Sequence, residues 1–148
     1  NHEILNKIRS SNESVGLHVR FFSDEIASSY DASIDYYNRA LDIINSNCSN
    51  PKIFLFSDKP EHAVKRLNLK DNDLFLVGNN KGDSKAHFDL HLLSNCKHII
   101  GANSTFSWWA AWLNESSDGI RIFPDMSGYT GVSSWGFDGL IPERWIKT

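Results

Sequence analysis

Small polar residues cluster at one point of this sequence, after an apolar run and before a tryptophan-rich segment. They form the stretch Asn103–Ser107. We expect a strand to end here and a helix to begin, with Asn103 or Ser104 as its N-cap. The first-turn N–H groups and the hydroxyls of Ser104, Thr105 and Ser107 would then form a donor cluster that suits a phosphate or another anion. Helix capping alone accounts for the same hydroxyls about as well, so both interpretations stay open.

A histidine and an arginine stand at the end of an earlier apolar segment. The segment Val15–Arg20 is typical of a β-strand, and His18 and Arg20 share one of its faces because side chains alternate along a strand. Arginine suits a bidentate grip on phosphate. A salt-bridged surface arginine is the alternative. A guanidinium after one strand and an anion-binding turn after another would complement each other.

The order of apolar segments indicates how these groups are positioned. We predict strands at 15–20, 52–57, 74–77, 97–102 and 119–123, and helices at 33–46, 60–67, 84–96 and 104–113. Alternation of strands and helices favours an α/β fold, with a parallel sheet covered by helices on both faces. Ligands of such sheets bind beyond the carboxyl ends of the strands. Other polar residues predicted at that edge are Ser57, Asp58, Asn79 and Asp125.

Composition limits the class of protein. The chain has 148 residues, 41% hydrophobic and 22% charged, which predicts one soluble domain over residues 1–148. A net charge of −3 gives no general attraction to nucleic acid. No apolar run approaches the ~18 residues of a membrane span. We therefore expect a protein without a transmembrane segment or a nucleic-acid partner, located in the cytoplasm or peripheral to the membrane of a bacterium.

Two histidines have the spacing of a zinc site. His87 and His91 are four residues apart in a predicted helix, but Phe88 replaces the glutamate of the H-E-x-x-H motif and no third ligand is evident. Cys48 and Cys96 are far apart and have no metal-ligand or redox spacing. We expect solvent-exposed histidines and no metal.

The tryptophan-rich helix has two apolar stripes. Phe106, Trp109, Ala110 and Leu113 form one face at helical spacing, and Trp108 and Trp112 form the second. We interpret both stripes as core, with a sugar-stacking platform as the alternative. An exposed Trp108 or Trp112 would instead mark a contact with another domain.

Several segments together resemble the α-1,2-fucosyltransferases of glycosyltransferase family eleven. That family carries an H-V-R-R-G-D-Y-like segment and a longer block of the form D-x-x-L-M-S-x-C-x-H-x-I-x-x-N-S-S-F-S-W-W. The matching segments here are His18–Arg20, Asp89–Ile100, Asn103–Leu113, Ile53–Asp58 (which ends in F-S-D) and Pro142–Trp145. The resemblance covers nearly the whole chain, and its long block is very specific.

The resemblance implies a fold, a reaction and a set of site residues. The fold is a Rossmann-like domain, one half of a GT-B type glycosyltransferase, and the reaction transfers fucose from GDP-fucose to a glycan hydroxyl in α-1,2 linkage, with inversion and without a metal. The residues it implies for nucleotide binding are His18, Arg20, Asp89, Asn103, Ser104, Thr105, Phe106 and Ser107. Arg20 and Asp24 are the implied catalytic residues, with Arg20 acting on the leaving diphosphate. Asp24 and Glu25 are both candidates for the general base, and the N-terminal domain of the family is the alternative source of that base.

Two features of the chain depart from the family pattern. Phe21 replaces the second arginine, Phe22 replaces the glycine, and Ser23 stands at the aspartate position, so that Asp24 comes one residue late. Only fourteen residues precede the first predicted strand, so we expect the N-terminal acceptor domain of the family to be absent from this sequence and the fragment alone to be inactive. The alternatives are a nucleotide-sugar-binding module without catalysis and an interaction domain that binds no nucleotide.

Overall fold

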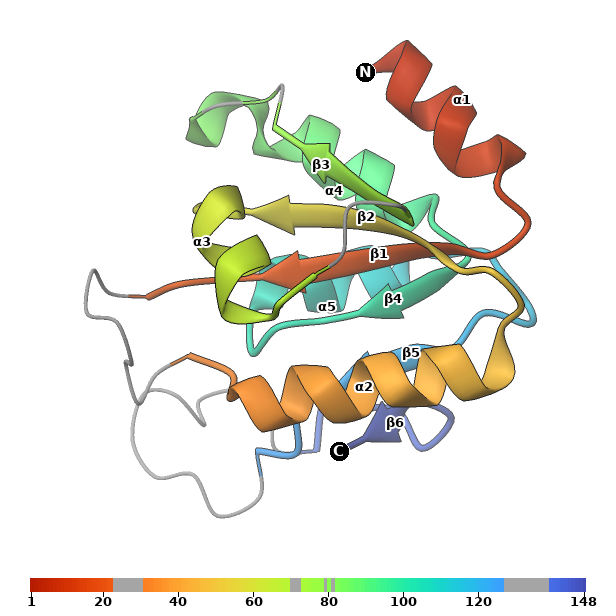
Figure 1. Ribbon diagram of the computed structural model, residues 1–148, viewed down its shortest axis with the longest axis vertical. Helices are drawn as coiled ribbons and strands as arrows, with labels where there is room; N and C mark the ends of the chain where they lie inside the picture. Colours follow the sequence, from red (N-terminus) through yellow and green to blue (C-terminus); the bar gives the residue numbers. More distant parts are fainter. Residues whose placement is uncertain (23–30, 70–72, 79, 81, 127–138) are drawn as a thin grey trace.

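In a computed structural model of the protein, six strands form one sheet between two layers of helices (Figure 1). The structure describes residues 1–22, 31–69, 73–78, 80, 82–126 and 139–148. The strands are β1 (Ser14–Val19), β2 (Lys52–Ser57), β3 (Leu74–Val77), β4 (His98–Ile100), β5 (Arg121–Phe123) and β6 (Ile146–Lys147). The helices are α1 (His2–Ser10), α2 (Ile34–Asn47), α3 (Pro60–Arg66), α4 (Ala86–Ser94) and α5 (Thr105–Trp112), with a 3-10 turn at Asp83–Lys85.

Every strand pair is parallel, and the order across the sheet is β3-β2-β1-β4-β5-β6. This is the strand order of Rossmann-type nucleotide-binding folds. The predicted fold class is therefore confirmed. The order reverses between β1 and β4, where Val15 lies opposite His98 and Leu17 opposite Ile100. Ligands bind in the crevice outside such a reversal point, so the ends of β1 and β4 are where a site is expected.

Each face of the sheet has its own core. The α2 and α3 side is built around Tyr36, Tyr37, Ile44 and Leu67, packed on β1 and its neighbours. The opposite side joins residues of α1, α4 and α5 to the sheet, and these include Ile4, Ile8, Leu92, Leu93, Ala110 and Ala111. Figure 1 shows α2 crossing in front of the sheet and α4 and α5 lying behind it.

Local sequence signals explain where two of the helices begin. The Ser33 side chain accepts a hydrogen bond from the Tyr36 N–H at 3.1 Å and caps α2. Ser104, one of the two predicted caps, accepts from the Phe106 N–H at 3.3 Å and caps α5. Ser104 therefore ends the short segment that joins β4 to α5. This position places its side chain near the point where the strand order reverses.

Two elements were not predicted from the sequence. Helix α1 buries Ile4 and Ile8, one turn apart, against α4. Strand β6 has two residues, too few for a periodic pattern, and its place depends on hydrogen bonds such as that from the Thr148 N–H to the Phe123 carbonyl at 3.2 Å.

The predicted core faces of α5 are right for Ala110, which is fully buried, and wrong for three of the large side chains. Trp109 and Leu113 are 52% and 54% exposed, and Trp112 is 50% exposed. The face that meets the sheet and α4 consists of Ser107, Ala110 and Ala111, whose small side chains allow the helix to approach closely. A helix that is apolar nearly all round has no periodic signal for its buried face, so the identity of that face depends on packing. No helix among the described residues is long and apolar enough to cross a membrane.

Candidate functional site

A cavity of about 760 Å³ opens at the carboxyl ends of β1, β2, β3 and β4. This volume lies within the range of roughly 300–1,000 Å³ that is typical of ligand sites. Its walls come from the segments that follow these strands and from α4 and α5. The lining residues are His18, Arg20, Phe22, Phe56, Ser57, Asp58, Pro60, Val77, Gly78, Asn80, Gly82, Ala86, Asp89, Ser104 and Phe106.

Five of the predicted site residues line this cavity. They are His18, Arg20, Asp89, Ser104 and Phe106. These residues come from three separate parts of the sequence, and the reversal of strand order brings them to one edge. An arginine and the first turn of a helix thus face the same space, an arrangement that can hold an anion.

Arg20 is held by an acidic neighbour. Its Nη1 donates to Asp58 Oδ2 at 3.0 Å, and the Arg20 side chain remains 45% exposed. Asp58 Oδ1 also accepts from the Phe21 N–H at 3.2 Å. One carboxylate therefore orients both the guanidinium and the backbone that follows β1, and leaves the guanidinium open to a ligand.

His18 is a neutral, buried wall of the cavity. It is 7% exposed, its ring centroid lies 5.1 Å from that of Phe106, and its Nδ1 has no hydrogen-bond partner among the described residues. Burial, together with the Arg20 charge, lowers the pKa of His18 to about 3. The imidazole is uncharged at neutral pH, so it offers a ligand hydrogen bonds and a flat apolar face but no positive charge.

Asp89 is the acidic group on the β3 side of the cavity. The Asn80 side chain donates to Asp89 Oδ1 at 2.6 Å, and Asn80 in turn pairs with Asn1 at the start of α1. Asp89 Oδ2 accepts no hydrogen bond from the described residues. Burial raises the pKa of Asp89 against the opposing effect of the Asn80 hydrogen bond. The carboxylate is thus positioned with one oxygen left to accept from a ligand.

Three of the residues implied for nucleotide binding do not line this cavity. Ser107 is fully buried, and its hydroxyl bonds the N–H and carbonyl of Ala102, both at 3.1 Å. It closes the turn between β4 and α5, so its expected direct contact with an anion is corrected to a structural role. Asn103 is buried beside a separate cavity of about 40 Å³, and Thr105 is exposed outside the 760 Å³ cavity.

Phe21 points away from the cavity. It is buried at 5% exposure, with the Arg66 guanidinium 5.6 Å and the His62 ring 4.8 Å from its ring centroid. The residue that replaces the family's second arginine therefore belongs to the core on the α3 side. The Phe21 side chain therefore contributes no group to the cavity wall.

Phe22 and Asn80 also line the cavity, and neither was predicted as a site residue. Both follow strands at the carboxyl edge of the sheet, and that position was the available signal. Asp24 and Glu25 lie outside the described residues.

His87 and His91 are both exposed, as predicted. A different group among the described residues, Glu13, Cys48 and His98, has ligand atoms close together. His98 Nδ1 accepts from the Ile120 N–H at 3.1 Å, so the ring proton sits on Nε2, which lies 2.6 Å from Glu13 Oε2. A metal on Nε2 would leave both ring nitrogens deprotonated. This group therefore fits a hydrogen-bonded cluster rather than a metal site.

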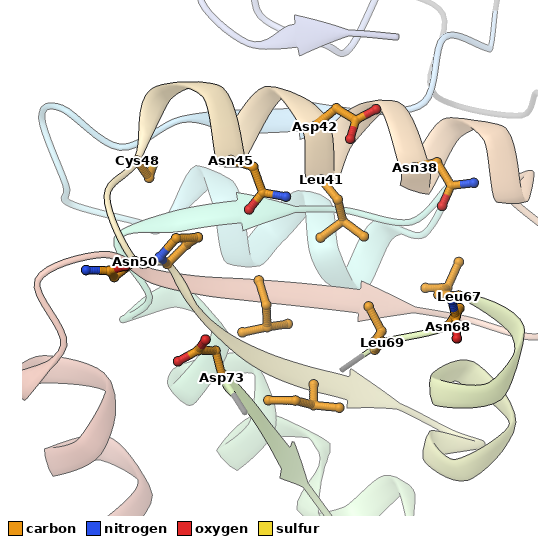
Figure 2. A pocket seen from close by; sticks show the side chains of 13 residues that line it. Asn38, Leu41, Asp42, Asn45, Cys48, Asn50, Leu67, Asn68, Leu69 and Asp73 are labelled. Atoms are coloured by element: carbon orange, nitrogen blue, oxygen red, sulfur yellow. The ribbon is translucent and has the colours of Figure 1, made fainter. Parts of the chain in front are cut away.

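A second cavity, of about 800 Å³, lies between α2 and the starts of β2 and β3 (Figure 2). Leu41, Leu67 and Leu69 contribute apolar walls, and Asp42 and Asp73 lie at its rim. No lysine or arginine is among the described residues that line it. Its acidic rim is unsuited to a phosphate group.

Comparison with known proteins adds three findings. The model of the family described as "Glycosyl transferase family 11" matches residues 1–128. An α-1,2-colitosyltransferase of Escherichia coli is 31% identical over 156 aligned positions, which cover 98% of this chain and 50% of that protein. The O-antigen biosynthesis glycosyltransferase WbnK of Escherichia coli is 34% identical over 113 positions, 73% of this chain and 37% of that protein.

A eukaryotic relative and a solved structure agree with these findings. The galactoside α-(1,2)-fucosyltransferase 2 of Rattus norvegicus is 30% identical over 104 positions, 67% of this chain and 29% of that protein. The crystal structure of the fucosyltransferase NodZ from Bradyrhizobium shares the fold, with a TM-score of 0.55, 23% identity and coverage of 76% of this chain and 39% of that one. This chain thus spans half or less of the length of the relatives it matches.

Proposed function

This chain belongs to glycosyltransferase family 11, and we propose that it is the donor-nucleotide half of an α-1,2-glycosyltransferase that uses GDP-fucose. The observation that supports the proposal most is the shared cavity of Arg20 and Ser104 at the reversal of strand order. A closely related donor, GDP-colitose, is the second candidate, because the relative whose match covers 98% of this chain is a colitosyltransferase.

Each part of the donor has a proposed partner in the cavity. The diphosphate lies between the Arg20 guanidinium and the N-terminal turn of α5, where a positive charge and oriented N–H groups meet. The neutral His18 packs beside the ribose or phosphates. The Asp89 carboxylate accepts the two adjacent N–H donors of guanine, N1–H and the 2-amino group, as the family resemblance implies.

The proposed reaction needs few groups. The bond between the anomeric carbon and the diphosphate oxygen breaks, and a hydroxyl oxygen of the acceptor bonds to that carbon from the opposite face, which inverts the configuration. The hydroxyl proton passes to a general base, for which Asp24 and Glu25 remain the candidates. GDP leaves with its new negative charge stabilised by Arg20 and the α5 turn, without reorganisation of the site.

Three further parts of the proposal come from the family. No metal takes part, because a fixed guanidinium and a helix N-terminus supply the positive potential. The acceptor is a glycan. We propose that acceptor recognition uses the part of the family's relatives that this chain does not match, since the chain spans half or less of their length.

Titration calorimetry with GDP tests the proposal. We expect heat of binding from the wild-type chain and none from the Arg20→Ala variant. Arg9→Ala is the matched control, because Arg9 is bonded to Asn95 and does not line the cavity. If GDP gives no heat with the folded wild-type protein, or if both variants lose binding equally, the donor assignment is wrong and an interaction domain becomes the better interpretation.

Turnover separates an enzyme from a binding module without catalysis. The full-length natural protein should release GDP from GDP-fucose in the presence of a galactoside acceptor. The burial of Phe21 favours the enzyme, because its side chain does not enter the cavity and leaves the space there open to the donor. A protein that binds GDP but never turns over would support the module instead.

A further inference from the structure

Phe22 is an aromatic residue with an unusual combination of exposure and position. Its side chain is 47% exposed, yet it lines the 760 Å³ cavity, and the Arg20 guanidinium carbon lies 5.9 Å from its ring centroid. Phe88 is another exposed phenylalanine among the described residues, at 42%, and it does not line this cavity. Exposed apolar surface that forms part of a cavity wall is characteristic of a ligand contact.

The backbone of Phe22 is held from the core. Its N–H donates to Asp31 Oδ1 at 2.8 Å. The Asp31 side chain is 2% exposed, and its second oxygen, Oδ2, lies 3.4 Å from Arg66 Nη1 on α3. A buried ion pair therefore fixes the point from which the ring projects beside Arg20.

The strand order indicates which part of a nucleotide sugar meets this ring. Asp89 and Asn80 lie on the β3 side of the cavity, and Arg20 and Phe22 follow β1, two strands away. Neighbouring strands are about 4.8 Å apart, so the chain segments that follow β3 and β1 leave the sheet roughly 10 Å from each other. If the base lies near Asp89 and the diphosphate on Arg20, the transferred sugar, which is bonded to the outer phosphate, lies at the Phe22 end.

We propose that Phe22 selects the donor sugar, by packing its ring against the deoxygenated edge of a 6-deoxy or 3,6-dideoxy hexose. The inference rests on the proposed function and extends it to the sugar. Fucose is L-galactose without the C6 hydroxyl, and colitose also lacks the C3 hydroxyl. An apolar ring favours the edges from which these hydroxyls are missing, because a hydroxyl buried against it loses its hydrogen bonds to water.

Three donors that differ by one hydroxyl at each step test this selection. We would measure dissociation constants of GDP-L-galactose, GDP-fucose, GDP-colitose and GDP for the full-length natural protein and for its Phe22→Ala, Phe22→Leu and Phe88→Ala variants. The wild type should bind the two deoxy donors about 10- to 100-fold more tightly than GDP-L-galactose, since apolar sites discriminate against an added hydroxyl to roughly that extent.

The variants separate the possible outcomes. Phe22→Ala should bring the ratio close to one, and Phe22→Leu should keep part of it. Phe88→Ala should keep the whole ratio and the wild-type affinity for GDP. An unchanged ratio in Phe22→Ala, or equal binding of all three donors by the wild type, overturns the inference, and the ring then faces the acceptor or solvent. Absence of GDP binding would instead overturn the proposed function, so the two failures are distinguishable.

Discussion

The carboxylate of Asp58 binds the Arg20 guanidinium at 3.0 Å and, through its other oxygen, the N–H of the next residue at 3.2 Å. The second bond makes Asp58 more than the partner of a surface ion pair. The Asp58 carboxylate holds the backbone two residues after the end of β1, where the chain enters the cavity wall. The two bonds differ in solvent exposure, and this difference leads to a prediction about stability.

We expect Asp58→Ala to destabilise the protein more than Arg20→Ala does. Loss of Asp58 leaves the part-buried Phe21 N–H without its acceptor, which costs about 1–3 kcal/mol. Loss of Arg20 removes only a half-exposed ion pair, worth about 0–1 kcal/mol. Urea unfolding of both variants measures the difference. Equal losses would mean that the backbone bond contributes nothing.

Asp89→Asn should abolish the preference for guanine. In its proposed role Asp89 is a charged acceptor for two N–H donors of guanine, and the substitution replaces it by an amide. GDP affinity should therefore fall roughly 10- to 100-fold, on the basis of about 1.5–3 kcal/mol for a hydrogen bond to a charged group. IDP, which lacks the 2-amino group, should bind the wild type less tightly than GDP and should bind the variant about equally. Asp42→Asn, at the second cavity, is the matched control. A variant that still prefers GDP to IDP contradicts the role of Asp89.

The affinity for GDP should also depend on pH through Asp89. Burial raises the pKa of this carboxyl above its ordinary value of 3.8, so GDP binding should weaken as the pH falls through that raised pKa and should be constant above it. Calorimetric titrations across the acid range measure this. The same series on Asp89→Asn should lack the step, and a step of equal size in the variant would assign it to another group.

His18 should make the fold sensitive to acid. Its pKa is lowered from 6.5 to about 3 in the folded protein, so between these values the unfolded chain takes up a proton that the folded protein does not. Stability is therefore complete above about pH 6.5 and falls as the pH drops towards 3, by up to about tenfold in the unfolding equilibrium constant per pH unit. Urea unfolding at several pH values should show a smaller acid loss in His18→Gln. The exposed His87→Gln is the control and should behave as the wild type does.

Gly101→Ala should strain the sheet next to the site. A Cβ at this position would overlap the ring of Phe123, which is fully buried in the core. Overpacking of this kind costs about 1–3 kcal/mol or more. Gly78→Ala is the comparison, because a Cβ there meets nothing within 4 Å. Thermal unfolding should show a clear fall in Tm for the first variant and little change for the second.

Much of the architecture followed from patterns within short segments. The alternation of strands and helices predicted the parallel α/β sheet, and the polar residues at strand ends predicted that Arg20 and Ser104 would lie at one edge. Asp89, in a helix, was expected there only from the family resemblance. These predictions succeed because the carboxyl ends of parallel strands share one edge of a sheet. Five of the eight residues implied for nucleotide binding line one cavity for this reason.

The sequence alone therefore determined the layers, the edge that bears the site and the residues that gather there. Only the tertiary structure decided which way individual side chains point at that edge. Ser107 turns inward to close a turn, Phe21 enters the α3 core, and Phe22 enters the cavity wall. The physical reason is that sequence periodicity predicts only on which face of its own helix or strand a side chain lies. The neighbour that this side chain contacts depends on how closely the separate elements pack. Helix α5 is an example. Its small residues Ala110 and Ala111 are buried because they permit a close approach to the sheet, whereas the larger Trp109, Trp112 and Leu113 are exposed.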